Sequence, residues 1–150
     1  MNSSRFVRSF ANKVPFFLCV VLLLVAGCSS GGKVDGLVEV TGQVTLDGKP
    51  VPGGIVAFRP DPSKGVSGPM SCGSIDENGQ YLVKTAGQKG VPAGWYVVTI
   101  DASSQGMLTG EGGKPVVIPK KYTRLDATPL KAEVKPGEKA VIDLKLESGA

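Results

Sequence analysis

Short runs of alternating apolar and polar residues, separated by turn formers, limit the folds open to this chain more than any other feature. In the first run, residues 37–46, one face carries Val38, Val40 and Val44, and the other face carries polar side chains. A period of two residues is typical of a strand with one buried face. The run therefore predicts a half-buried β-strand.

Further runs of this kind follow, and none shows the 3.6-residue period of an amphipathic helix. Residues 76–79, Asp-Glu-Asn-Gly, predict a tight hairpin turn in which Asn78 and Gly79 supply the positive φ angles. Pro119 limits its strand to a short one or one at an edge, and residues 102–115 are expected to form a glycine-rich loop. The later strands are expected at residues 55–60, 70–75, 80–86, 95–101, 116–123, 130–134 and 140–147. About seven short strands predict an all-β fold, an antiparallel β-sandwich.

The N-terminal segment has the layout of a secretory signal. Basic residues and no acidic ones precede the apolar stretch at 14–26, which only Pro15 interrupts. A membrane-spanning helix needs roughly 20 apolar residues, and this stretch is shorter. A basic start, a short apolar region and a cleavage site with small residues are typical of a signal peptide. We therefore expect residues 1–27 to be removed.

The end of the apolar stretch specifies the kind of signal. Val25-Ala26-Gly27-Cys28 resembles the bacterial lipobox, in which the cysteine thiol receives a diacylglycerol and the cysteine becomes the mature N-terminus. The resemblance implies lipidation of Cys28, a flexible tether over residues 28–36, and a location in the bacterial cell envelope, on the periplasmic side or at the outer membrane. Two or more acyl chains hold a protein on a membrane. An ordinary signal with an unmodified cysteine is the alternative.

Composition excludes several functions once the signal is removed. Three of the 17 Lys and Arg residues lie in residues 1–27, so the mature chain has 14 basic and 13 acidic side chains, which gives no argument for nucleic acid as a partner. The chain has no histidine, the usual general base and zinc ligand. We expect no enzyme, cofactor or metal site. A hydrolase with paired carboxylates is the remaining enzymatic alternative.

Five segments match one family in the same order along the chain. With them the chain resembles small bacterial lipoproteins that carry a carboxypeptidase-regulatory-like, transthyretin-like domain, and the resemblance covers residues 38–147. It implies a seven-stranded prealbumin-like β-sandwich over residues 37–148. Most members of the family have no assigned activity, so the resemblance bears on fold rather than function. The matching segments are residues 40–60, 73–83, 89–100, 118–123 and 130–146.

Two surface features are candidates for binding. Lys120, Lys121 and Arg124 flank Tyr122 in PKKYTR. Such a cluster could contact phosphate headgroups or anionic glycans, whereas lysines at a sheet edge also discourage aggregation. Trp95 is offset from the core face of its strand. It could stack on a sugar or partner, or pack against the facing sheet or a loop.

These observations predict a non-enzymatic, membrane-anchored lipoprotein with a structural or interaction role in the cell envelope. Its partners would be the membrane, through the lipid, and an envelope protein or glycan. A glycan- or peptide-binding module is the alternative. Cys72 is the only mature cysteine besides Cys28, which excludes an intramolecular disulfide. It is expected to be a small buried hydrophobe, or else to pair between chains.

Overall fold

The computed structural model describes residues 34–102, 108–137 and 139–149, and the structural statements below refer to these ranges. The expected signal peptide and Cys28 lie outside them. No helix in these ranges has the length and apolar character that crossing a membrane requires.

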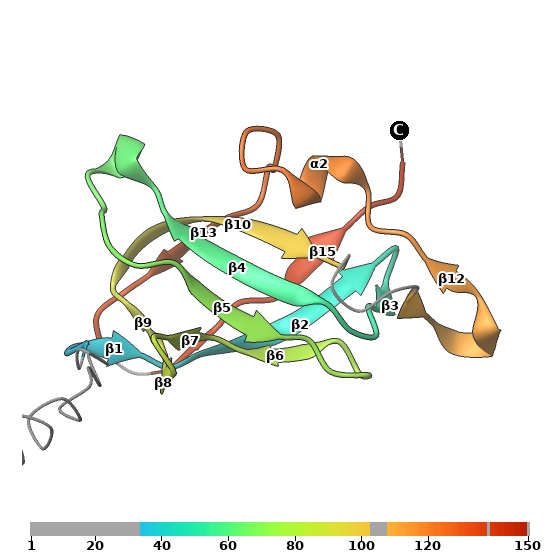
Figure 1. Ribbon diagram of the computed structural model, residues 1–150, viewed down its shortest axis with the longest axis horizontal. Helices are drawn as coiled ribbons and strands as arrows, with labels where there is room; N and C mark the ends of the chain where they lie inside the picture. The colour runs from blue at the N-terminus through green and yellow to red at the C-terminus, as the bar shows by residue number, and fades with distance from the viewer. Residues whose placement is uncertain (1–33, 103–107, 138, 150) are drawn as a thin grey trace, which may run out of the picture. The chain divides into compact units, whose positions relative to one another are not determined.

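Two main sheets form the domain (Figure 1). A six-stranded sheet contains, in spatial order, β13 (Lys131–Val134), β10 (Gly94–Asp101), β4 (Ile55–Pro60), β5 (Ser71–Ser74), β7 (Lys84–Thr85) and β8 (Gln88–Lys89). The five-stranded sheet is built around β2 (Val40–Leu46), which pairs on one side with β14 (Ala140–Val141) and β15 (Leu144–Leu146), and on the other with β3 (Lys49–Pro50) and β6 (Gln80–Leu82). Two short pairs accompany them: β1 (Leu37–Val38) with β9 (Val91–Pro92), and β11 (Leu108–Thr109) with β12 (Pro115–Val116).

One hydrophobic core joins the inner faces of the two sheets. Val40 and Val44 on β2 are fully buried, as are Val98 and Ile100 on β10. Phe58 lies among them, with its ring centroid 6.2 Å from that of Tyr81 and 5.9 Å from that of Tyr96. Burial of one such side chain stabilises the fold by about 1.5–3 kcal/mol. The all-β sandwich predicted from the sequence is confirmed.

The pairing of the last strands differs from the purely antiparallel expectation. β14 and β15 run parallel to β2, whereas the other pairings in the described ranges are antiparallel. The carboxylate of Asp143 accepts a hydrogen bond from the Gln43 amide at 3.0 Å. A Cβ atom on Gly42 would lie 1.9 Å from the Ile142 carbonyl oxygen. The close approach of the C-terminal segment therefore depends on glycine at this position.

The 76–79 turn forms as expected, but with different backbone angles. The Asp76 carboxylate accepts hydrogen bonds from the amides of Asn78 and Gln80, both at 2.8 Å. Gly79 has a φ of 77°, whereas Asn78 is not among the described residues with positive φ. The expectation for Asn78 is therefore wrong. Aspartate at the first position and glycine at the fourth are typical of a type I turn, which requires no positive φ at its third residue.

Several expected segments are divided differently in the structure; residues 37–46 form β1 and β2, and residues 140–147 form β14 and β15. Residues 80–86 supply β6 to one sheet and β7 to the other, with Val83 fully buried between them. In residues 116–123 the strand ends at Val116, and α2 (Lys120–Thr123) forms a helical turn that the sequence did not predict. Pro119 precedes α2 with a φ of −59°, which suits a helix start. The described part of 102–115 contains β11, the short turn η3 (Glu111–Gly113) and the start of β12.

Candidate functional site

The PKKYTR residues do not form a single exposed patch. Tyr122 is 4% exposed, and its hydroxyl oxygen accepts a hydrogen bond from the Glu147 amide at 3.1 Å. The Lys121 ammonium donates to the Gly149 carbonyl at 3.1 Å and lies 5.0 Å from the centroid of the Tyr122 ring. These contacts attach the chain end beyond β15 to α2. Tyr122 is thus a core residue rather than the expected surface contact.

The other two basic residues of the cluster remain at the surface. Lys120 is exposed, and Arg124 forms two hydrogen bonds with the Asp126 carboxylate, at 3.1 and 2.7 Å. The hydrogen bond from Arg124 is the main reason why the pKa of Asp126 lies below its usual value. Because Arg124 already has an anionic partner, a ligand would compete with Asp126. A binding role for Lys120, Lys121 and Arg124 stays a prediction.

Trp95 points away from the core, on the outer face of β10. Its side chain is 36% exposed, and it stands opposite Glu133 in the β10–β13 ladder. The Lys64 ammonium lies 5.5 Å from the centroid of the indole ring, a typical cation–π arrangement. Trp95 was expected to bind a ligand, to pack against the facing sheet or to pack against a loop. Its outward position excludes packing against the facing sheet, and its contact with Lys64 is a contact with a loop.

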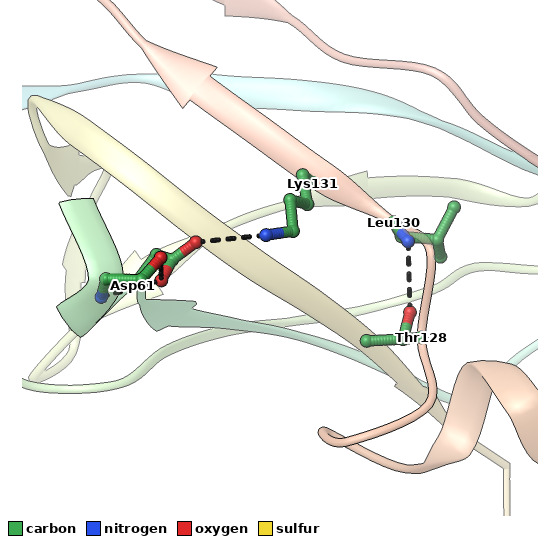
Figure 2. A network of polar contacts seen from close by, with 5 residues as sticks. Asp61, Thr128, Leu130 and Lys131 are labelled. Atoms are coloured by element: carbon green, nitrogen blue, oxygen red, sulfur yellow. Dashed lines mark hydrogen bonds and ion pairs between the residues drawn. The ribbon is translucent and has the colours of Figure 1, made fainter.

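A polar network fixes the loop beside Trp95 (Figure 2). The Asp61 amide donates to the Trp95 carbonyl at 2.9 Å. The Asp61 carboxylate accepts from the amide and hydroxyl of Ser63, at 3.0 and 2.6 Å, and from the Lys131 ammonium at 3.3 Å. Asp61 is only 4% exposed. We call Asp61, Ser63, Lys64, Trp95 and Lys131 the Trp95 corner.

The hydrogen bonds of Asp61 also set its ionisation. The Ser63 hydroxyl is the largest cause that lowers the pKa of Asp61 below its usual value of 3.8, and the Lys131 ammonium adds to it. Charge-assisted hydrogen bonds of this kind favour the carboxylate form. Asp61 is thus a structural anion at the corner.

Thr128 fixes the neighbouring edge of β10 (Figure 2). Its hydroxyl donates to the Val98 carbonyl at 2.8 Å and accepts from the Leu130 amide at 3.2 Å. The Val98 amide also donates to the Leu130 carbonyl at 2.9 Å, just before β13 begins at Lys131. The threonine therefore continues the strand edge where regular pairing stops, and it places Lys131 beside Asp61.

The sequence contains a local signal for the turn at this corner. Pro62–Lys64 form a 3₁₀ turn, η1, with Asp61 as N-cap and Gly65 at a φ of 71° as C-cap. An aspartate followed by proline and, three residues later, glycine is typical of a capped helical turn. Such a turn brings Lys64 over Trp95, which the sequence pattern alone does not reveal.

Cys72 lies in an open cleft on the outer face of the six-stranded sheet. The cleft has a volume of about 920 Å³ and is also lined by Ile55, Met70 and Val117. Cys72 is exposed and free, so its expected burial is wrong. Within the described ranges, no group of three or more His, Cys, Asp and Glu residues is placed to hold a metal ion.

No protein-family model matches the chain, and a search of curated proteins gives no match either. Among solved structures, the chain is similar to a crystal structure of the major pilin subunit of Bacillus cereus, at 16% sequence identity and a TM-score of 0.45. The match covers 74% of this chain and 29% of the pilin chain. We draw no function from this likeness, and the resemblance to transthyretin-like lipoproteins stays a prediction beyond the all-β fold.

Proposed function

We propose that this protein is a lipid-anchored, non-enzymatic module of the bacterial cell envelope. In this proposal residues 1–27 are a cleaved signal, residues 28–36 are the tether, and residues 37–148 form the β-sandwich. The observation that carries it is Val25-Ala26-Gly27-Cys28 at the end of a short apolar stretch. The first strand begins at Leu37, nine residues after Cys28, which supports a folded domain close behind the anchor.

The interior of the domain supports a structural or interaction role. Every buried side-chain nitrogen or oxygen in the described ranges has a hydrogen-bond partner. The Ser71 and Thr85 hydroxyls, for example, lie 2.7 Å apart, and Thr85 also donates to the Gly90 carbonyl at 2.6 Å. A core with satisfied polar groups favours one rigid structure. Contacts with an envelope protein or glycan would then be made by loops and strand edges.

A glycan- or peptide-binding function is the second candidate, and the exposed indole of Trp95 favours it. Aromatic side chains at the surface are frequent anchors in binding sites. This function predicts saturable binding of a glycan or peptide that Trp95→Ala abolishes and that Lys49→Ala, at an exposed lysine of β3, leaves unchanged.

Two cysteine variants test the anchor with a matched control. A fatty acid that carries a clickable tag is supplied to cells that produce the full chain, Cys28→Ser or Cys19→Ser. Cys19 lies in the expected signal, so its loss should leave lipidation unchanged. We expect label on the wild type and on Cys19→Ser, and none on Cys28→Ser. Label that persists on Cys28→Ser, or a wild type without label, would contradict the proposal.

A further inference from the structure

We propose that the Trp95 corner, together with Lys84 and Lys89, contacts an anionic phospholipid surface, so that this end of the sandwich faces the membrane. The inference rests on the proposed lipid anchor and adds an orientation to it. Four observations support it: the position of the corner, the exposure of the indole, the exposed lysine pair on β7 and β8 at the other edge of the same sheet, and the contact of Lys64 with the ring.

The first observation is that the corner and the start of the domain share one end. Leu37 on β1 pairs with Pro92 on β9, three residues before Trp95. The Tyr96 hydroxyl donates to the Pro92 carbonyl at 2.7 Å, which holds β9 against the start of β10. In Figure 1, β1, β8 and β9 lie together at the lower left, and the green turn that follows β4 lies at the upper left of the same side.

The length of the tether keeps that end near the anchor. Leu37 lies nine positions after Cys28, and a fully extended chain over nine positions spans about 30 Å at roughly 3.3–3.6 Å per residue. A glycine- and serine-rich tether covers about half that distance on average. The end that carries β1 is therefore within reach of the lipid headgroups.

The second observation is the exposed indole itself. Trp95 points outward at 36% exposure, beside a loop that is fixed by the Asp61 hydrogen bonds. Val66 packs close to the Cα atom of Gly94, so the backbone before Trp95 is also held. Tryptophan has an apolar ring and a polar N–H, and it is enriched at membrane–water interfaces for that reason. A preformed indole at this end suits the headgroup region.

The third observation is a pair of lysines with the same charge at close range. Lys84 on β7 and Lys89 on β8 stand directly opposite each other in the ladder, and both are exposed. Like charges in this position destabilise a sheet, and a bound anion would relieve their repulsion. Basic side chains near an anionic leaflet are attracted to it. The lysines therefore favour phospholipid headgroups as the anionic partner.

Two acidic groups near this end are paired with lysines, whereas Asp35 and Glu133 are exposed. Asp61 pairs with Lys131, and Glu39 pairs with Lys139 at 2.7 Å. Glu133 stands beside Trp95, where Lys64 also lies. The repulsion that free carboxylates would exert on a phospholipid surface is thus reduced.

The contact between Lys64 and the indole favours lipid over a glycan. A sugar binds tryptophan by stacking on a ring face, and Lys64 lies over one face at 5.5 Å. In a membrane interface the same ammonium can contact a phosphate while the ring edge enters the headgroup layer. Glycan binding is accordingly one outcome of the test below.

Trp95 is the only tryptophan of the chain, so its fluorescence reports on this corner alone. The lipidated protein, purified from membranes, is reconstituted into phosphatidylglycerol–phosphatidylcholine vesicles that contain brominated acyl chains. Flotation of the vesicles measures anchoring separately. We expect a blue-shifted emission and quenching by the brominated lipid, both reduced by half or more in pure phosphatidylcholine vesicles.

Charge-reversal variants test the geometry. Lys64→Glu and Lys89→Glu should reduce the quenching, whereas Lys49→Glu, an equal charge change at an exposed lysine of β3, should leave it unchanged; circular dichroism checks that each variant is folded. Vesicles that float with the protein while Trp95 stays unquenched would overturn the inference and leave the anchor intact. An emission shift caused by soluble glycan fragments but not by lipid would overturn it in favour of glycan binding. Protein that fails to float would overturn the anchor and this inference together.

Discussion

The burial of Tyr122 leads to a quantitative prediction, because its ring and its hydroxyl have separable roles. The side chain is 4% exposed, and truncation of a buried aromatic residue to alanine costs about 3–5 kcal/mol. The hydroxyl accepts one hydrogen bond, from the Glu147 amide at 3.1 Å. Its removal in Tyr122→Phe leaves a partly buried amide without that acceptor, at a cost of about 1 kcal/mol. We therefore expect Tyr122→Ala to lose about three to five times as much stability as Tyr122→Phe.

Urea unfolding of the mature protein, followed by circular dichroism, measures both losses. Total stabilities of domains are about 5–15 kcal/mol, so the alanine variant should show a large fall in midpoint. Lys120→Ala is the matched control, since its exposed side chain should contribute less than about 0.5 kcal/mol. A Tyr122→Ala variant within about 1 kcal/mol of the wild type, or an equal loss in Lys120→Ala, would refute the assignment of Tyr122 to the core.

Three further predictions test other contacts. Gly42→Ala should destabilise the domain more than Gly149→Ala in urea unfolding, because its Cβ would lie 1.9 Å from a carbonyl oxygen, whereas nothing lies within 4 Å of a Cβ on Gly149; equal losses would contradict the close approach. The pKa of Asp61 lies below 3.8, mainly through the serine hydroxyl two positions on. The Asp61 carboxylate therefore stabilises the fold fully above pH 3.8, and this stabilisation is lost as the pH falls through the lower pKa that the group has in the folded protein. The stability difference between wild type and Asp61→Asn should accordingly shrink between about pH 7 and pH 2. A difference that stays constant over this range would argue against the lowered pKa. Exposed Cys72 should react with a maleimide in the native protein, as mass spectrometry would show, and reaction only after denaturation would place it in the interior.

Strand positions and inward faces could be predicted from the sequence because they depend on local alternation. Val40 and Val44 are fully buried, as the period of two indicated. The alternation at the chain end also holds, with Leu144 and Leu146 buried and Lys145 exposed. Local patterns of this kind identify which face of a strand is buried without any knowledge of its neighbours.

The pairing of strands could not be predicted, because it depends on residues far apart in the sequence. The parallel pairing of β15 with β2 joins Leu144 to Val44, and no local signal distinguishes it from an antiparallel one. Cys72 was expected to be buried, but its neighbour Ser71 is fully buried instead. The Ser71 hydroxyl forms a hydrogen bond with the Thr85 hydroxyl. A small polar residue that is satisfied by a distant hydroxyl gives no hydrophobic pattern.

In the candidate site, too, the local pattern could be predicted from the sequence, whereas contacts between distant residues could not. Trp95 was identified because it is offset from the core face, whereas its contact with Lys64 depends on a turn that folds back over β10. Tyr122 was expected at the surface because it lies among basic residues, but α2 turns its ring inward. Charge in the neighbouring sequence is thus a poor guide to burial where a strand gives way to a helical turn.

The intact mass of the protein from a native membrane fraction tests the proposed anchor most directly. The account predicts the mass of residues 28–150 plus that of its acyl chains, with no form that retains residues 1–27 as the main species. A mass equal to that of the unmodified chain, whether cleaved or whole, would contradict the lipid anchor and with it the proposed orientation of the Trp95 corner.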